Sequence, residues 1–235
     1  IFLFSDHGEE FYDHGGVAHH ETLYREQLHV PLIIRMPGAT PPTGRVSRKV
    51  SHLDFFATVM DALNMDYTAP ITSHSLLPLI QQDGHEKEYK RTYATSELVN
   101  GYTYNRMLIS IEDDKHKYIL TTEINNPKSP VSEQWDIISQ PNDTSLQRRL
   151  LNALDSADKE TASGVKQELF SFPTDLLERH NTVDSEGETS LVMRQLLRSS
   201  LDEAQATAQL WETDSETFTP LTDEEREALE AAGYL

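Results

Sequence analysis

The sequence has no cysteine and no long apolar run. None of its 235 residues is cysteine, which excludes disulfide bonds and thiolate zinc sites and leaves the redox compartment open. No stretch approaches the roughly 18 consecutive apolar residues of a membrane-spanning helix, so we expect no membrane span. The printed sequence also shows no signal-peptide pattern at its N-terminus, which leaves the cellular location undetermined.

Basic residues are scarce. The chain has 20 Lys and Arg against 39 Asp and Glu, a formal net charge of −19. Nucleic acids and anionic membranes would repel such a chain, so we expect neither as a partner. The same balance favours solubility and the binding of cations. The apolar fraction of 37% is sufficient for one sizeable core.

Polar chemistry follows directly on an apolar strand at the start of the chain. Residues 1–4 are all apolar and predict a strand that is buried on both faces. The strand is followed by Asp6, His7 and Gly8, and ligands bind at this end of the strands in open α/β sheets. Asp6 offers a hard oxygen ligand, His7 a nitrogen ligand, and Gly8 permits a tight bend. The triplet therefore indicates a metal site, although an ordinary surface turn has a similar pattern.

Further segments extend this pattern along the chain. They are Asp6-His7-Gly8-Glu9-Glu10-Phe11, Asp13-His14-Gly15-Gly16, His19-His20, Thr22-Leu23-Tyr24, and residues 30–38, 50–63, 75–80, 117–119, 168–170 and 229–235. In this order the chain resembles the sulfatase family, within the alkaline-phosphatase-like superfamily of metallohydrolases. The resemblance implies an α/β fold: the C-terminal part of a mixed-sheet α/β sandwich of alkaline-phosphatase-like type, with a small antiparallel C-terminal sheet and helices.

The resemblance also implies roles for four side chains. Asp6 and His7 would bind one divalent cation, with Ca²⁺ expected and Mn²⁺, Mg²⁺ and Zn²⁺ as alternatives. His19 stands thirteen residues after Asp6, where related enzymes place a Lys or His that contacts the sulfate or phosphate oxygens. A protonated imidazole there would stabilise charge or protonate the leaving alcohol. His14 matches a recurrent family position and is a second catalytic candidate, in a supporting role. We expect all four side chains to converge on one pocket.

The formylglycine nucleophile of sulfatases is not found in this chain. It is made from the Cys or Ser of a Cys/Ser-x-Pro-x-Arg motif, and the nearest patterns, at 139–141 and 171–173, are followed by Asp143 and Asp175 where the motif needs Arg. Two further carboxylate metal ligands of the family precede the matched region. We therefore expect a fragment, the C-terminal half of a longer enzyme, whose partner is the N-terminal half. The chain alone should not hydrolyse a sulfated small molecule or glycan.

Two parts are expected along the chain: residues 1–90 as the C-terminal part of the catalytic α/β domain, and 91–235 as a small α+β subdomain with terminal helices. Hydrophobic patterns predict strands at 30–35, 92–97, 107–111, 118–122 and 169–172, and a short helical turn at 22–27. Ser51 and Asp54 form a capping-box pattern before a longer helix. A helical stripe over 193–211 indicates core packing, and 221–232 predicts a final helix. Residues 125–165 read as a polar connection.

Two alternatives remain open. A phosphoester or phosphonoester hydrolase or transferase of the same superfamily would share the resemblance, and a non-catalytic chain that binds a cation or a partner would share the composition. An upstream Cys/Ser-x-Pro-x-Arg motif would favour the enzyme. Export to the periplasm, in a bacterial relative, is compatible with the resemblance.

Overall fold

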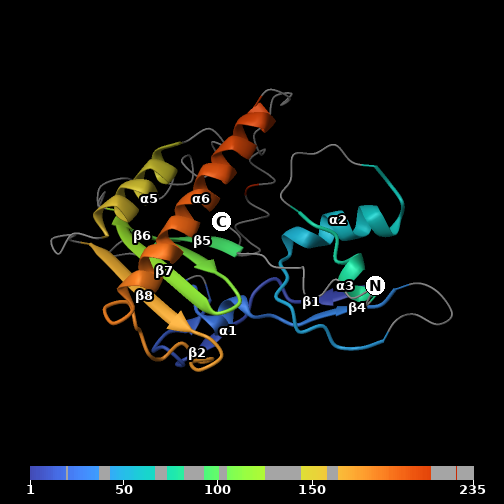
Figure 1. Ribbon diagram of the computed structural model, residues 1–235, viewed down its shortest axis with the longest axis horizontal. Helices are drawn as coiled ribbons and strands as arrows, with labels where there is room; N and C mark the ends of the chain where they lie inside the picture. Colours follow the sequence, from blue (N-terminus) through green and yellow to red (C-terminus); the bar gives the residue numbers. More distant parts are fainter. Residues whose placement is uncertain are drawn as a thin grey trace.

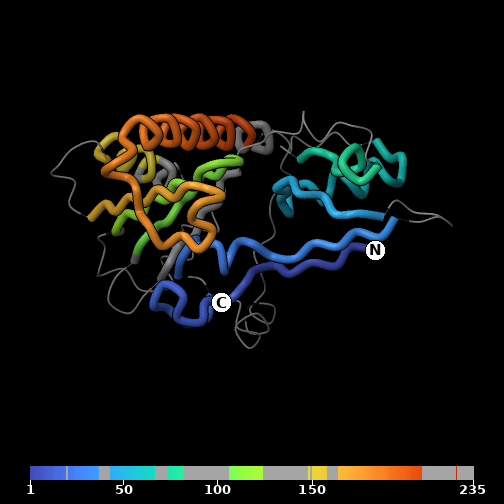
Figure 2. Tube along the Cα trace, turned by 60° about the horizontal axis from the view of Figure 1, so that its bottom comes forward, coloured from blue at the N-terminus to red at the C-terminus, as the bar shows by residue number. Residues whose placement is uncertain are grey.

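The computed structural model describes residues 1–19, 21–36, 43–66, 73–81, 93–100, 105–124, 144–157 and 164–212, together with Arg226. Within these residues, a four-stranded sheet with two helices on one face lies beside a smaller unit in which helices α2 and α3 cover strands β1 and β4 (Figure 1). The segment from β2 to α1 lies on the other face of the four-stranded sheet (Figure 2).

The four-stranded sheet is antiparallel throughout, in the order β5-β6-β7-β8. Its strands are β5 (Tyr93–Asn100), β6 (Asn105–Glu112), β7 (His116–Ile124) and β8 (Val165–Ser171). Between β6 and β7 the Asp113 carboxylate accepts hydrogen bonds from the backbone N–H groups of Lys115 and His116, at 2.7 and 2.6 Å, which closes a hairpin. The predicted strands and the small antiparallel sheet are confirmed.

The main core lies between this sheet and helices α5 (Thr144–Ser156) and α6 (Gly187–Glu212). Its most buried members, each at most 1% exposed, are Ile111, Tyr118, Leu120, Leu169, Met193 and Leu197. Of the predicted helical stripe at 193–211, Met193, Leu196, Leu197 and Leu201 pack in this core, whereas Ala204 is exposed and the side chains at 208–211 lie outside the described ones. On the opposite face of the sheet, Leu23 packs against Leu108, Ile119 and Phe170.

Helix α5 corrects the expectation of a polar connection over residues 125–165. Residues 144–156 are helical, and Leu150, Ala153 and Leu154 are each 5% exposed. Their spacing of three and four residues places them on one helical face. On the other face the polar residues Arg148, Asn152 and Asp155 are exposed.

Strand β1 (Phe2–Phe4) corrects a second expectation, burial on both faces. Among the described residues its strand partner is β4 (Leu32–Ile34), which runs antiparallel to it. Leu3 and Ile33 face each other across this pair and are 61% and 60% exposed. The rings of Phe2 and Phe4, on the other face, contact Phe55 of helix α2, with centroids 5.6 and 4.7 Å apart. An apolar run cannot distinguish one covered face from two, because burial depends on the layers packed around it.

Helix α2 (Leu53–Ala62) begins two residues after Ser51, with His52 at its N-cap position. The Ser51 N–H donates to the Asp54 carboxylate, and the Leu53 N–H donates to Ser51 Oγ, both at 3.3 Å. Asp54 is fully buried and also accepts from the His74 N–H at 3.1 Å, just before helix α3 (Leu77–Ile80). These contacts give Asp54 a structural role.

The predicted final helix at 221–232 lies outside the described residues except for Arg226. In the part of the chain that the structure describes, no helix is both long enough and apolar enough to cross a membrane. The proposed division near residue 90 stays a prediction.

Candidate functional site

The candidate site lies on the loop that connects β1 to a small hairpin. After β1 the chain passes Asp6 and His7, enters β2 (Glu10–Phe11), turns, and returns through β3 (Val17–Ala18) toward helix α1 (Arg25–Leu28). Gly8 fixes this path: its N–H donates to the Gln27 carbonyl at 2.8 Å, and a Cβ at Gly8 would lie 1.9 Å from the Glu26 carbonyl oxygen. Only glycine permits so close an approach of the loop to α1.

Asp6 and His7 are adjacent and oriented by backbone hydrogen bonds. The Asp6 carboxylate is 77% exposed and accepts from the His7 N–H at 3.0 Å. This hydrogen bond lowers the pKa of Asp6, which favours the ionised carboxylate. The Nδ1 atom of His7 lies 2.9 Å from the Gly8 carbonyl, which can only accept, so Nδ1 carries a proton. In the neutral ring the lone pair is then on Nε2, 3.8 Å from the Asp6 carboxylate.

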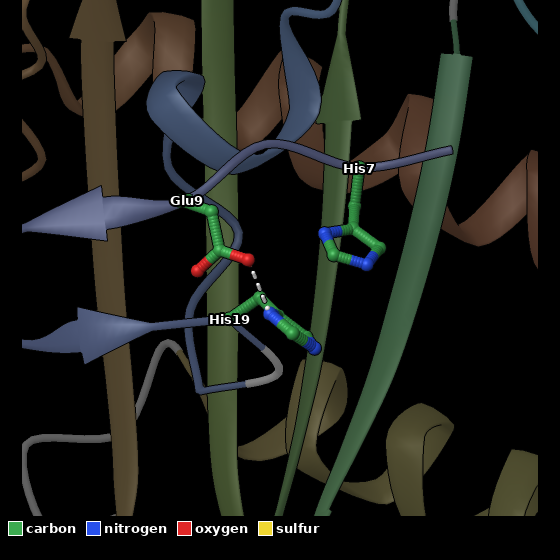
Figure 3. Close-up of side chains that lie close together, drawn as sticks. All are labelled: His7, Glu9 and His19. Atoms are coloured by element: carbon green, nitrogen blue, oxygen red, sulfur yellow. Dashed lines mark hydrogen bonds and ion pairs between the residues drawn. The ribbon is translucent and has the colours of Figure 1, made fainter. Parts of the chain in front are cut away.

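His19 lies beside His7, as Figure 3 shows. The two ring centroids are 4.0 Å apart, and the Glu9 carboxylate holds His19 Nδ1 at 2.7 Å. Possible ligand atoms of His7, Glu9 and His19 all lie within 4.8 Å of one another. Glu9 was not predicted as a site residue. Glu9 directly precedes β2, and its approach to His19 depends on the pairing of β2 with β3, which the sequence pattern at residues 6–8 does not contain.

His14 lies in a different group of side chains. Its ring stacks on Tyr24, with centroids 3.8 Å apart and planes inclined by 15°. Its ring nitrogens contact the Glu26 carboxylate and the Glu178 carbonyl, and its backbone N–H donates to the buried Glu10 carboxylate. The structure thus brings Asp6, His7 and His19 together and places His14 in a separate buried cluster.

The residues of the candidate site lie within a segment, residues 1–65, that the sulfatase family model matches. We call residues 1–65 the sulfatase segment. Residues 1–65 belong to the sulfatase family. The sulfatase segment contains β1 to β4, α1, α2 and all four predicted site residues. The expected family membership is therefore confirmed for this segment.

Two curated relatives are similar to part of this chain. Arylsulfatase K of Gallus gallus is 26% identical over 164 residues, which is 68% of this chain and 30% of the relative. Arylsulfatase K of Danio rerio is 31% identical over 120 residues, which is 51% of this chain and 22% of the relative. The matched part of this chain thus spans less than a third of the length of either relative.

Two solved structures share the fold. One is assigned as a sulfatase from Bacteroides thetaiotaomicron VPI-5482, and the other is BT1596, a 2-O GAG sulfatase. Their TM-scores are 0.53 and 0.52, each at 17% identity, and each match covers 93% of this chain and 38% of the solved chain. These similarities confirm the predicted α/β fold class.

Proposed function

We propose that this chain supplies the Asp6, His7 and His19 portion of the active site of a sulfate-ester hydrolase. The observation that carries the proposal is the convergence of these three side chains at the open end of the β2–β3 hairpin, within the sulfatase segment. These side chains are suitable for such a reaction. An exposed carboxylate and one imidazole can bind a cation, and the second imidazole can bind an anionic ester.

Asp6 and His7 would bind one divalent cation. The ionised Asp6 carboxylate supplies an oxygen, and the Gly8 carbonyl fixes the His7 tautomer that presents Nε2 as the nitrogen ligand. Ca²⁺ is the first candidate, with Mn²⁺, Mg²⁺ and Zn²⁺ as alternatives, because the carboxylate oxygen suits Mg²⁺ and Mn²⁺ and the imidazole nitrogen suits Zn²⁺. The bound cation would polarise the ester oxygens and hold the nucleophile. Since Ca²⁺ takes six to eight ligands, this pair supplies only part of its coordination.

His19 would act on the substrate. The Glu9 carboxylate accepts from Nδ1 and orients the ring beside His7. An imidazolium in this position would donate to a sulfate oxygen or protonate the departing alcohol. The formylglycine nucleophile would come from a Cys/Ser-x-Pro-x-Arg segment outside these 235 residues, and the substrate would be a sulfated small molecule or glycan.

Two substitutions separate the proposed roles of Asp6 and His19. In a polypeptide that joins this chain to a formylglycine-bearing sulfatase segment, Asp6→Asn should lower both the metal content and the turnover of an aryl sulfate, with partial rescue by added Ca²⁺ or Mn²⁺. His19→Ala should keep the metal and lower turnover by about 10²-fold or more. His180→Ala, at a side chain that is 83% exposed, is the matched control.

Metal analysis and steady-state kinetics on the three variants decide the assignment. A His19→Ala protein that loses its metal, or that turns over like the unsubstituted protein, would show that His19 has another role. An Asp6→Asn protein with full metal content would remove Asp6 from the cation site. Parallel assays with an aryl phosphate test the phosphoester alternative.

A further inference from the structure

We propose that His14 is a positioning residue, held as an imidazolium in a buried chain of charges that joins the site loop to the four-stranded sheet. This charge chain consists of Lys117, Glu178, His14 and Glu26. It goes beyond the proposed function, because it concerns how the loop that carries Glu9 and His19 is held in place and how that hold depends on pH.

Both ring nitrogens of His14 face acceptors. Nε2 lies 3.0 Å from the Glu178 carbonyl oxygen, which can only accept, so this nitrogen carries a proton. Nδ1 lies 2.5 Å from a carboxylate oxygen of Glu26, which also accepts when ionised. The His14 and Glu26 side chains are only 12% and 17% exposed. A ring that donates from both nitrogens is the imidazolium.

Glu178 connects this ring to the sheet. Its carboxylate accepts from Nζ of Lys117 on β7, at 3.0 and 3.2 Å, and from the Arg25 N–H at the start of α1, at 2.9 Å. The side chains of Lys117 and Glu178 are each 1% exposed. Glu178 has a φ of +52°, a left-handed conformation that is unfavourable for a residue other than glycine. Surrounding contacts must hold such a backbone, and here they direct the carbonyl to His14 and the carboxylate to Lys117.

The charges around His14 favour its protonated form. Glu26 and the backbone of Arg25 face it from α1, Glu10 from β2, and Glu178 and Lys117 from the sheet side. Burial lowers the pKa of His14, but the hydrogen bonds to Glu26 and to the Glu178 carbonyl, with the charges of Glu26 and Glu10, outweigh it and raise the pKa above its ordinary value. The uncharged Tyr24 ring covers one face.

A metal site is the competing explanation for this cluster, because possible ligand atoms of Glu10, His14 and Glu26 lie within 4.8 Å of one another. The hydrogen bonds of the fold already use these atoms. Glu10 accepts from the N–H groups of His14 and Gly16, at 3.1 and 2.7 Å, and from the Thr22 hydroxyl at 3.2 Å. Both imidazole nitrogens are engaged as well, so the cluster serves to fasten the loop.

The charge chain makes the hold on the loop dependent on pH. Because its folded pKa is raised, His14 contributes stability that is fully present below its unfolded pKa of about 6.5 and is lost as pH rises through the folded pKa. Above the folded pKa, one ring nitrogen of His14 loses its proton and can no longer donate a hydrogen bond to the acceptor oxygen beside it. The hairpin of β2 and β3 should then loosen.

The direct test is a pH titration of histidine ring nitrogens by NMR on the unsubstituted 235-residue chain. The titration midpoint of His14 should lie above about 6.5, so that at pH 6.5 most of its rings carry a proton on both nitrogens. Amide protection factors of residues 10–18 should fall through the same midpoint. A singly protonated ring at pH 6.5, or protection that does not change with pH, would overturn the proposal.

Two variants separate the charge effect from a merely structural one. Glu26→Gln keeps a hydrogen-bonding partner but removes the charge, so the His14 midpoint should fall and the change in protection should move with it. His180→Gln, at an exposed position, should leave both unchanged. A Glu26→Gln protein with the original midpoint would contradict the charge chain. None of these measurements uses turnover, so failure here is distinguishable from failure of the proposed function.

Discussion

At the scale of single residues, Lys117 is notable because it is a charged side chain in the interior. Its ammonium is 1% exposed and is paired with the equally buried carboxylate of Glu178. Burial raises the pKa of Glu178, and the charge of Lys117 opposes that rise. A pair of this kind contributes little net stability against an apolar replacement of both members, but the loss of one member leaves a buried charge without its partner.

Lys117→Met should therefore destabilise the chain by about 3–5 kcal/mol, because the Glu178 carboxylate loses its counter-charge in the interior. Lys166→Met is the matched control. Lys166 is 62% exposed and pairs at 2.9 Å with Glu168, which keeps the hydrogen bond from the Tyr24 hydroxyl when the lysine is removed, so we expect a smaller loss than for Lys117→Met. Urea unfolding at pH 7 measures both. Equal effects of the two substitutions would show that the buried pair has no special importance.

The residues of the site were predictable to different degrees. Asp6 and His7 are neighbours in the sequence, and His19 has a fixed spacing from them, so local pattern and family resemblance indicated all three. Glu178 stands 164 residues from His14, and only the folded chain brings them together. With 39 acidic residues in the sequence, charge alone cannot indicate which carboxylate faces which histidine.

At the scale of elements, regular hydrophobic patterns predicted the correct secondary structure, whereas segments of mixed polar and apolar residues did not. The apolar segments at 107–111 and 118–122 form β6 and β7, and the stripe at 193–211 lies in α6. Helix α5 was missed because its apolar face is short and polar residues make up most of the segment around it. Strand β1 was predicted correctly as a strand, but its burial depends on neighbours that a local pattern does not specify.

Helix α5 should be an integral part of the core. Leu154→Ala should lower the free energy of unfolding by about 2–5 kcal/mol, because a buried leucine leaves a cavity against the sheet. Asn152→Ala, on the exposed face of the same helix, should change it by about 0.5 kcal/mol or less. Thermal or urea unfolding measures both. A loss below 1 kcal/mol for Leu154→Ala would mean that α5 does not pack as described.

At the scale of the whole molecule, the sulfatase segment contributes to two packing units. Strands β1 and β4 lie under α2, whereas the region from β2 to α1 packs on the four-stranded sheet through Leu23 (Figure 2). The candidate loop with Asp6 and His7 lies between these two parts of the segment. Its geometry is therefore set by the packing on both sides, which a sequence pattern at residues 6–8 does not contain.

The most direct test of the cation site is paramagnetic broadening by Mn²⁺, used as a probe in substoichiometric amounts on the 235-residue chain. The account predicts broadening of the His7 ring and of amide signals at residues 6–8. This broadening should be lost in Asp6→Asn and kept in Asp66→Asn, a control at another exposed acid. Broadening centred on Glu10 and Glu26, or equal in Asp6→Asn and the unsubstituted chain, would contradict a cation site at Asp6 and His7.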